Sequence, residues 1–188
     1  MNKNTIKYFF ELGTLKRQKR TGWWLAGVKN PESVAEHSWR TAVIAYFLAA
    51  EEGLDPEKAC SRALFHDVLE ARLGDLHKVN TNYLKTTKEL EKRIELAQCK
   101  KLGKTGDRVL DLLNDEKFRV VCKDADYLEL CVQAKEYEDV GFKATRDWLN
   151  RAGSRLKTKT AKKMLSEIKK TDSTVWWKGL KQKVSEYK

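Results

Sequence analysis

The chain has 188 residues, which is long enough for one domain with its own core and short for two. Hydrophobic residues make up 41% of it, and six Trp, six Tyr and six Phe supply large side chains to bury, which argues against a disordered chain. No apolar run approaches the ~18–20 residues that a membrane span needs, and residues 1–10 lack a signal-peptide core. The four cysteines form no CxxC pair, which argues against a zinc–thiolate site or a disulfide framework. We therefore expect a cytoplasmic protein with reduced thiols.

The net charge of +11 raises the question of a polyanionic partner. Positive charge attracts nucleic acid and small phosphate esters alike. No helix-turn-helix, zinc-finger or RNA-binding signature accompanies the charge, so nucleic acid is not the expected partner. Solvated helix faces are the simpler interpretation of the basic residues, which are densest in the C-terminal third: Arg155, Lys157, Lys159, Lys162, Lys163, Lys169 and Lys170.

In chain order, a first helix is predicted from Asn4 to about Leu15, with Gly13 as its stop signal, and a basic loop follows at 16–24. The next helix has a marked start, because Ser33 and Glu36 form a capping-box pattern, and it runs to about Glu52.

Asp55 followed by Pro56 predicts a further helix, which passes through His66 to about Leu73 and stops at Gly74. A helix opened by Thr86 with Glu89 and ending at Gly103 comes next, followed by a short one over Asp107–Asn114 and a long one from Phe118 to about Val140. Two more helices are marked by apolar residues: Trp148, Leu149, Leu156, Met164, Leu165 and Ile168. The last predicted helix is anchored by Val175, Trp176, Trp177 and Leu180. Only Val120–Cys122 hints at a strand, in a helical context. We predict an all-α bundle of roughly seven to nine helices in a single domain over 1–188.

Two of the three histidines fall on predicted inner helix faces. Thr41, Ile44 and Leu48 follow His37 at helical spacing, and His66 ends the next inner face beside Asp67. A lone histidine of this kind is usually an ordinary core residue, but a buried aspartate is unfavourable unless it is paired or bound to a metal. Imidazole and carboxylate together suit Mn, Fe, Co, Ni or Zn.

A third carboxylate comes from Lys123-Asp124-Ala125-Asp126, inside an otherwise apolar helix. Periodicity slightly favours Asp124 as the buried one, because it shares a face with Val120 and Leu128. The spacing alone leaves the choice between Asp124 and Asp126 open.

These residues carry a resemblance to a known family. The histidine, the His-Asp pair that begins 29 residues later, and the distant aspartate resemble the HD-domain superfamily of metal-dependent phosphohydrolases. A bare His-Asp pair is not specific, but five ordered blocks are similar to the branch of the 5'-deoxynucleotidase and its archaeal and eukaryotic relatives. The blocks cover roughly 17–134: Arg20-Thr21-Gly22-Trp23, Pro31-Glu32-Ser33-Val34-Ala35-Glu36-His37-Ser38, His66-Asp67-Val68-Leu69-Glu70, Gly74-Asp75-Leu76 and Asp126-Tyr127-Leu128-Glu129.

The resemblance implies an HD-domain helical bundle, with the motif-bearing core followed by C-terminal helices over 142–188. It also implies one divalent transition metal held by His37, His66, Asp67 and Asp126. Asp126 is chosen over Asp124 because the family's fourth ligand stands three residues after the position that Lys123 occupies here.

The same resemblance implies the groups that bind and hydrolyse the substrate. Glu70 and Asp75 match the family's acidic pair beside the metal, and Arg20 matches a phosphate-contacting arginine. Trp23 matches the sugar-facing tryptophan, although two residues separate it from the arginine here and none do in the bacterial enzyme. Glu70 can orient or deprotonate a water, while Asp75 can protonate the leaving 5'-oxygen or position that water. The simpler interpretations are a solvated Glu70 and an Arg20 that belongs to a basic surface loop.

The resulting hypothesis is a 5'-nucleotidase that hydrolyses (deoxy)nucleoside 5'-monophosphates, with no membrane partner. One alternative is an HD phosphohydrolase that acts on another phosphate ester or nucleotide. The other is a basic nucleic-acid-binding protein that uses the HD fold as a scaffold. Relatives are commonly dimers, so we expect a homodimer, with Trp148, Trp176 and Trp177 as interface residues or as core.

Overall fold

The computed structural model describes residues 3–84 and 87–180, and over these residues the fold is helical. The only β-type pairing in them is an isolated bridge between Lys19 and Ser33. The predicted all-α class is therefore confirmed. Extension of one domain over the whole of 1–188 stays a prediction.

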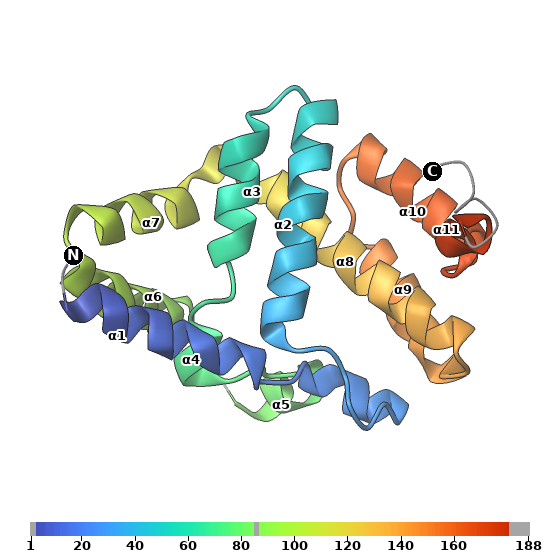
Figure 1. The fold of residues 1–188 in the computed structure, drawn as a ribbon, viewed down its shortest axis with the longest axis horizontal. Helices are drawn as coiled ribbons and strands as arrows, with labels where there is room; N and C mark the ends of the chain where they lie inside the picture. The colour runs from blue at the N-terminus through green and yellow to red at the C-terminus, as the bar shows by residue number, and fades with distance from the viewer. Residues whose placement is uncertain (1–2, 85–86, 181–188) are drawn as a thin grey trace, which may run out of the picture.

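Three helices form the centre of the molecule (Figure 1): α2 (Val34–Glu51), α3 (Pro56–Phe65) and α8 (Arg119–Asp139). Their starts follow local chemistry that the sequence already displays. Ser33 and Glu36 form the capping box of α2, and the Asp55 carboxylate accepts the backbone N–H of Lys58 at the start of α3.

Small side chains lie on the inner faces of α2 and α3, and these helices pack closely against each other. Larger apolar side chains come from Phe118, just before α8, from α8 itself and from Leu156. The buried members that α2 and α3 contribute are Ala42, Ala45, Leu48, Ala49, Ala59 and Ala63. Because alanine has no bulk beyond Cβ, it allows the two helix backbones to approach and brings the ends of α2 and α3 toward α8.

The remaining helices flank this centre on two sides (Figure 1). On one side lie α1 (Lys3–Leu12), α6 (Lys88–Cys99) and α7 (Lys104–Asn114), and on the other lie α9 (Arg146–Gly153), α10 (Lys159–Lys170) and α11 (Val175–Lys178). Short segments connect them: η1 (Gly13–Lys16), η2 (Thr21–Ala26), α4 (Glu70–Leu73), α5 (Lys78–Tyr83), η3 (Lys100–Leu102), η4 (Glu116–Phe118) and η5 (Lys143–Thr145).

The prediction of one continuous helix from Pro56 to about Leu73 is wrong. Helix α3 ends at Phe65, a turn covers 66–69, and α4 begins at Glu70. The break has a local cause, because the His66 imidazole Nδ1 bonds to the carbonyl oxygen of Ala63 at 2.6 Å, and shorter-range backbone bonds replace the helical ladder after it. The spacing of apolar residues cannot predict this break, because it depends on a side chain that takes a backbone carbonyl as its hydrogen-bond acceptor.

The other predicted helices are largely observed. The helix predicted from Phe118 to about Val140 corresponds to α8, and Val120–Cys122 lies within it rather than in a strand. Thr87 caps α6 by accepting the backbone N–H of Leu90, whereas the predicted cap Thr86 lies outside the described residues. Helix α5 was not predicted.

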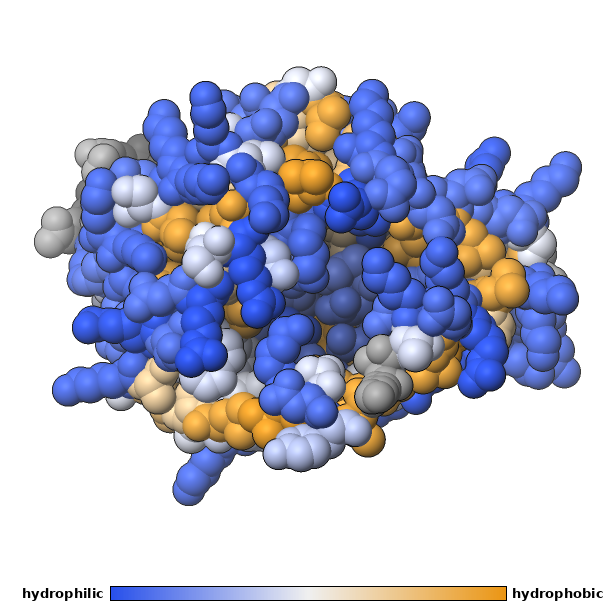
Figure 2. All heavy atoms as spheres, turned by 180° about the vertical axis from the view of Figure 1, so that it is seen from behind, coloured by the Kyte–Doolittle hydropathy of each residue, from blue (hydrophilic) through white to orange (hydrophobic). Residues whose placement is uncertain are grey.

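The surface is mostly hydrophilic on the face that Figure 2 shows, with separate hydrophobic patches between the charged side chains. None of the described helices is long and apolar enough to cross a membrane. Of the predicted interface residues, Trp148 packs 6.0 Å from Trp23 between ring centroids, whereas Trp176 is 72% exposed.

Candidate metal centre

Three separate segments bring imidazole and carboxylate groups to one place. His37 lies in the first turns of α2, His66 and Asp67 lie in the turn after α3, and Asp126 lies on α8. His37, His66 and Asp126 each offer one ligand atom, and these atoms lie within 4.8 Å of one another. Asp67 joins them, since its Oδ2 is 3.1 Å from His66 Nε2 and 3.7 Å from His37 Nε2. The structure thus gathers all four of the predicted metal ligands.

The His37 ring is completely buried and is oriented by a second carboxylate. Its Nδ1 pairs with Glu129, and its Nε2 faces the cluster, 3.3 Å from Asp126 Oδ1. Glu129 is also fully buried, and Arg40 Nε donates to its other oxygen at 3.0 Å. A carboxylate behind an imidazole is the usual arrangement for holding a metal-ligating histidine in one tautomer.

Sequence reasoning missed this function of Glu129. One signal was available, because Glu129 follows Asp126 by three residues and therefore lies one helical turn away on the same side of α8. That spacing did not indicate that the imidazole of His37 would reach the same turn.

The His66 ring presents its second nitrogen to the same space. Because the Ala63 carbonyl can only accept, Nδ1 donates to it, and Nε2 faces Asp67 Oδ2 at 3.1 Å. Nε2 is buried and has no hydrogen-bond partner among the described residues. A buried imidazole nitrogen that faces carboxylates can give up its proton to bind a cation in the same place.

The charges around the cluster support the same conclusion. Burial and the Arg20 guanidinium both lower the pKa of His37, but Glu129 and Asp126 outweigh them and raise it to about 10. Burial raises the pKa of Asp67, but His66 and Arg20 overcome it and hold this pKa well below its usual range. The cluster therefore stabilises positive charge strongly, and its two imidazoles and two carboxylates fit a divalent transition metal.

The two candidate aspartates of α8 have separate surroundings. Asp126 faces the histidines and also accepts from Lys123 Nζ at 2.6 Å. Asp124 is 1% exposed, as periodicity predicts, but its carboxylate accepts the backbone N–H groups of Lys157 and Thr158 at 2.7–3.1 Å. The structure therefore brings Asp126 to the cluster and leaves Asp124 in the packing of the C-terminal helices.

The predicted phosphate-binding arginine lies beside the cluster. Arg20 NH1 is 3.6 Å from Asp67 Oδ2 and donates to Asp75 Oδ1 at 3.0 Å. Asp75 also accepts the backbone N–H of Thr21 at 2.6 Å and the Thr21 hydroxyl at 2.7 Å. The Asp75 carboxylate thus holds the loop that carries Arg20, and His77 caps the nearby α5 by accepting the N–H of Asn80.

Glu70 begins α4 next to this group. Its Oε2 is buried and has no hydrogen-bond partner among the described residues. Burial, followed by the negative charge of Asp67, raises the pKa of Glu70 to about 9. A carboxyl group in these surroundings can hold a proton near neutral pH, as a general acid requires, and its raised pKa makes the carboxylate form a stronger base.

Trp23 lies deeper than the predicted sugar contact requires. It is 1% exposed, its ring meets Tyr137 edge to face, and its indole N–H donates to Glu32 Oε1 at 3.0 Å. Burial, and then the Glu129 charge, raise the pKa of Glu32 to about 7. Glu32 is a second buried carboxylate near His37 that sequence reasoning did not single out, and the sugar contact of Trp23 stays a prediction.

Comparison with known proteins gives this site a family. An HD-domain profile matches residues 12–169 of the chain. The 5'-deoxynucleotidase HDDC2 of Dictyostelium discoideum is 35% identical over 152 residues, which cover 72% of this chain and 78% of the relative.

Solved structures agree on the architecture. A conserved hypothetical protein from Pyrococcus furiosus is 30% identical, with a TM-score of 0.69, and the match covers 88% of this chain and 99% of that protein. The cyanophage S-2L HD phosphohydrolase bound to dA and one catalytic Zn²⁺ is 22% identical, with a TM-score of 0.54 over 86% of this chain and 96% of its own, which shows a shared fold.

Proposed function

Because the chain belongs to the HD-domain family, we propose that it is a metal-dependent phosphohydrolase that converts (deoxy)nucleoside 5'-monophosphates into nucleoside and phosphate. One observation carries this proposal: ligand atoms of His37, His66 and Asp126 lie within 4.8 Å of one another. Relatives that bear the name 5'-deoxynucleotidase support the substrate class.

We propose that His37, His66, Asp67 and Asp126 hold one divalent ion, which is Mn, Co, Ni, Fe or Zn. When bound, such an ion supplies an activated water and polarises a phosphoryl oxygen. Glu129 holds the His37 ring through Nδ1, so that Nε2 faces the cluster and would be available to the ion.

The other residues act on the substrate. Arg20, whose guanidinium lies 3.6 Å from Asp67 Oδ2, binds phosphate oxygens. Glu70 moves the proton of the attacking water, since its Oε2 has no competing partner among the described residues. Asp75 positions Arg20 and the loop that carries it, because its carboxylate oxygens already accept hydrogen bonds from Arg20 and Thr21. Trp23 contributes to sugar binding indirectly, because its indole N–H donates to Glu32 and holds that carboxylate in place.

Phosphate release from a substrate panel tests the proposal. The panel contains mono-, di- and triphosphates in ribo and deoxy forms, each assayed with Mn, Co, Ni, Zn and Mg. We expect the highest rate with a monophosphate and a transition metal. Preference for a triphosphate or a non-nucleotide ester would instead favour the alternative HD phosphohydrolase.

Asp67→Ala provides the matching variant, and we expect it to lose both bound metal and turnover. Asp111→Ala, which removes an exposed carboxylate on α7, is the control and should keep both. Persistent phosphatase activity in the Asp67 variant would overturn the mechanism. Salt-sensitive binding to single- or double-stranded nucleic acid without phosphatase activity would favour the scaffold alternative.

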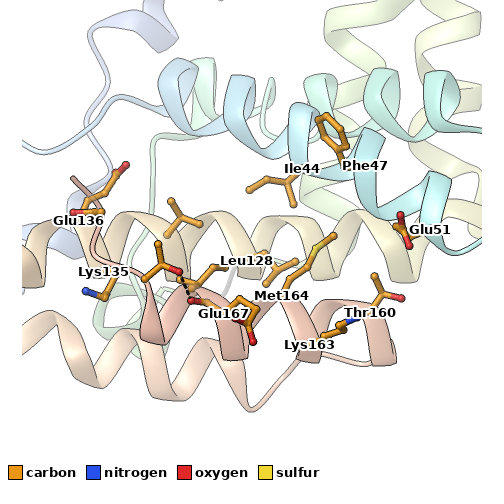
Figure 3. Close-up of a pocket in the computed structure, with 14 residues that line it drawn as sticks. Ile44, Phe47, Glu51, Leu128, Lys135, Glu136, Thr160, Lys163, Met164 and Glu167 are labelled. Atoms are coloured by element: carbon orange, nitrogen blue, oxygen red, sulfur yellow. Dashed lines mark hydrogen bonds between the residues drawn. The ribbon is translucent and has the colours of Figure 1, made fainter. Parts of the chain in front are cut away.

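We also propose a homodimer, and an exposed apolar stripe on α2 supports it. Trp39, Val43, Tyr46 and Phe47 recur at helical spacing and are 38–64% exposed. The stripe borders a cavity of about 690 Å³ between α2, α8 and α10, whose lining includes Ile44, Phe47 and Met164 (Figure 3). Monomeric proteins seldom expose large aromatic stripes of this kind.

Light scattering on the purified chain measures the oligomeric state. We expect a dimer for the unaltered protein and a monomer for Trp39→Glu with Phe47→Glu. Tyr83→Glu, on α5, is the matched control for an exposed aromatic. A monomer in the unaltered protein would contradict the homodimer.

A cytoplasmic location is the last part of the proposal. The four cysteines are unpaired, and Cys99, Cys122 and Cys131 are buried. Free buried thiols suit a reducing compartment. Localisation of a tagged full-length chain by fluorescence tests this point.

A further inference from the structure

Helices α1 and α6 lie next to each other on one side of the molecule (Figure 1), and a second cavity is lined by residues of both. It has a volume of about 460 Å³ and is bounded by α1, α6, η3 and Arg72 of α4. Small-molecule sites typically measure ~300–1,000 Å³. None of the residues that line this cavity belongs to the candidate metal centre.

Two buried polar atoms on the cavity wall have no hydrogen-bond partner among the described residues. They are the Tyr8 hydroxyl, on a residue that is 6% exposed, and Oε1 of Gln98, on a residue that is 3% exposed. The Gln98 amide is fixed in this orientation, because Nε2 donates to Glu11 Oε1 and to the Val68 carbonyl, both at 2.9 Å. A buried polar atom without a partner costs roughly 1–3 kcal/mol, so a ligand that reached both atoms would gain by pairing with them.

The cavity rim carries surplus positive charge. Glu11 is already engaged, since Arg72 donates to both of its oxygens at 2.6 and 2.8 Å and lowers its pKa. Lys7 and Lys100 are exposed on the rim and form no ion pair within the part of the chain that the structure describes. Lysine ammonium groups of this kind attract phosphate as point charges.

We propose that this cavity binds a nucleoside phosphate at a site separate from the metal centre. Lys7 and Lys100 contact the phosphate, while a hydroxyl or amino group of the nucleoside donates to Gln98 Oε1 and pairs with the Tyr8 hydroxyl. Gln98 also holds the carbonyl of Val68, which directly follows Asp67, so the site is linked to the turn that carries the His-Asp pair. The proposal holds whichever ester the metal centre hydrolyses.

Two-dimensional ¹H–¹⁵N NMR of the zinc-loaded full chain tests the proposal, with a nonhydrolysable phosphonate analogue of dAMP as the probe. We expect saturable shifts of the amide signals of residues 97–102 that are separate from the shifts around Thr21. Deoxyadenosine, which lacks the phosphate, and inorganic phosphate, which lacks the nucleoside, should each bind at least ~10-fold more weakly at residues 97–102. Equal binding of either fragment would overturn the assignment.

Two variants separate binding from folding. Tyr8→Phe removes only the hydroxyl, so we expect ~5–10-fold weaker binding at residues 97–102 with no fall in Tm. Lys7→Ala with Lys100→Ala should weaken binding ~10-fold or more. Lys159→Ala with Lys162→Ala makes the same charge change on α10 and should leave binding unaltered. Unchanged affinity in both cavity variants, or no shift at residues 97–102, would overturn the proposal.

Discussion

The two faces of α8 use the same type of residue for opposite purposes. Toward α2, Asp126 and Glu129 lie among imidazoles, and toward α9 and α10, Asp124 and Cys131 lie in close packing. The Asp124 carboxylate has its hydrogen bonds supplied by backbone N–H groups, which are fixed in the folded chain. Asp126 instead lies beside the side chains of Lys123, His37 and His66, which can change their partners.

The difference shows which buried carboxylates are able to take part in chemistry. A carboxylate that is satisfied by fixed backbone donors stabilises the fold and has no remaining capacity for a ligand. A carboxylate that is balanced by titratable side chains gains a cation readily, because the imidazoles can give up their protons to make room. Both carboxylates lie inside the fold, Asp124 fully buried and Asp126 partly so, but they differ above all in the type of donor that surrounds them.

The largest effect should come from Asp126→Ala. Because it removes a proposed ligand whose ion supplies several kcal/mol of transition-state stabilisation, we expect turnover to fall at least ~10³-fold. Phosphate release and metal content measured by elemental analysis check this outcome. Asp124→Ala, corrected for the folded fraction, should keep its metal, and equal metal loss in the two variants would erase the distinction between the faces.

Glu129→Gln should have a smaller effect on the same face. The amide keeps the shape of the side chain but weakens its hold on the His37 ring, so metal affinity should fall ~10–100-fold. Competition with a chelator measures that affinity. Glu136→Gln, which alters another carboxylate partner of Arg40, is the matched control, and an identical loss there would mean that Arg40 rather than His37 transmits the effect.

Asp124→Ala should act on stability alone. The backbone N–H groups of Lys157 and Thr158 lose a charged acceptor, and we expect the free energy of unfolding to fall by ~3 kcal/mol. This corresponds to a Tm lower by ~6–12 °C for a chain of this size. Calorimetry checks the value, and Asp124→Asn should recover part of it. A Tm within ~2 °C of the unaltered protein would contradict a structural function for Asp124.

The smallest effect concerns Cys131 and pH. Burial raises the pKa of its thiol to about 12, so the folded chain keeps this proton in a range where the unfolded chain has lost it. The stabilising contribution is present below the ordinary thiol pKa of ~8.5 and declines as pH rises above it. Denaturant unfolding between pH 8 and 10 should therefore show that the free energy of unfolding falls more steeply with pH in the unaltered protein than in Cys131→Ala. An equal pH dependence in the two proteins would contradict this prediction.

Most of the helical framework could be predicted because its signals are local. The capping box at Ser33 and Glu36 and the Asp55–Pro56 start act within one turn of chain, and both are observed. The break after Phe65 was not predicted, because it depends on the His66 side chain bonding back to its own helix. Apolar periodicity predicts which helix face is buried, but it does not predict that a side chain will bond to the backbone of its own helix.

The sequence by itself determined the all-α class and the set of imidazole and carboxylate groups from which a metal site can be built. The tertiary structure alone decided which atoms meet: that Asp126 faces His37 while Asp124 holds backbone amides, that Glu129 orients the imidazole, and that Trp23 is bonded to Glu32. The physical reason is range. Caps and periodicity act over a few residues, whereas His37 and Glu129 are 92 residues apart and meet only because α2 and α8 pack together.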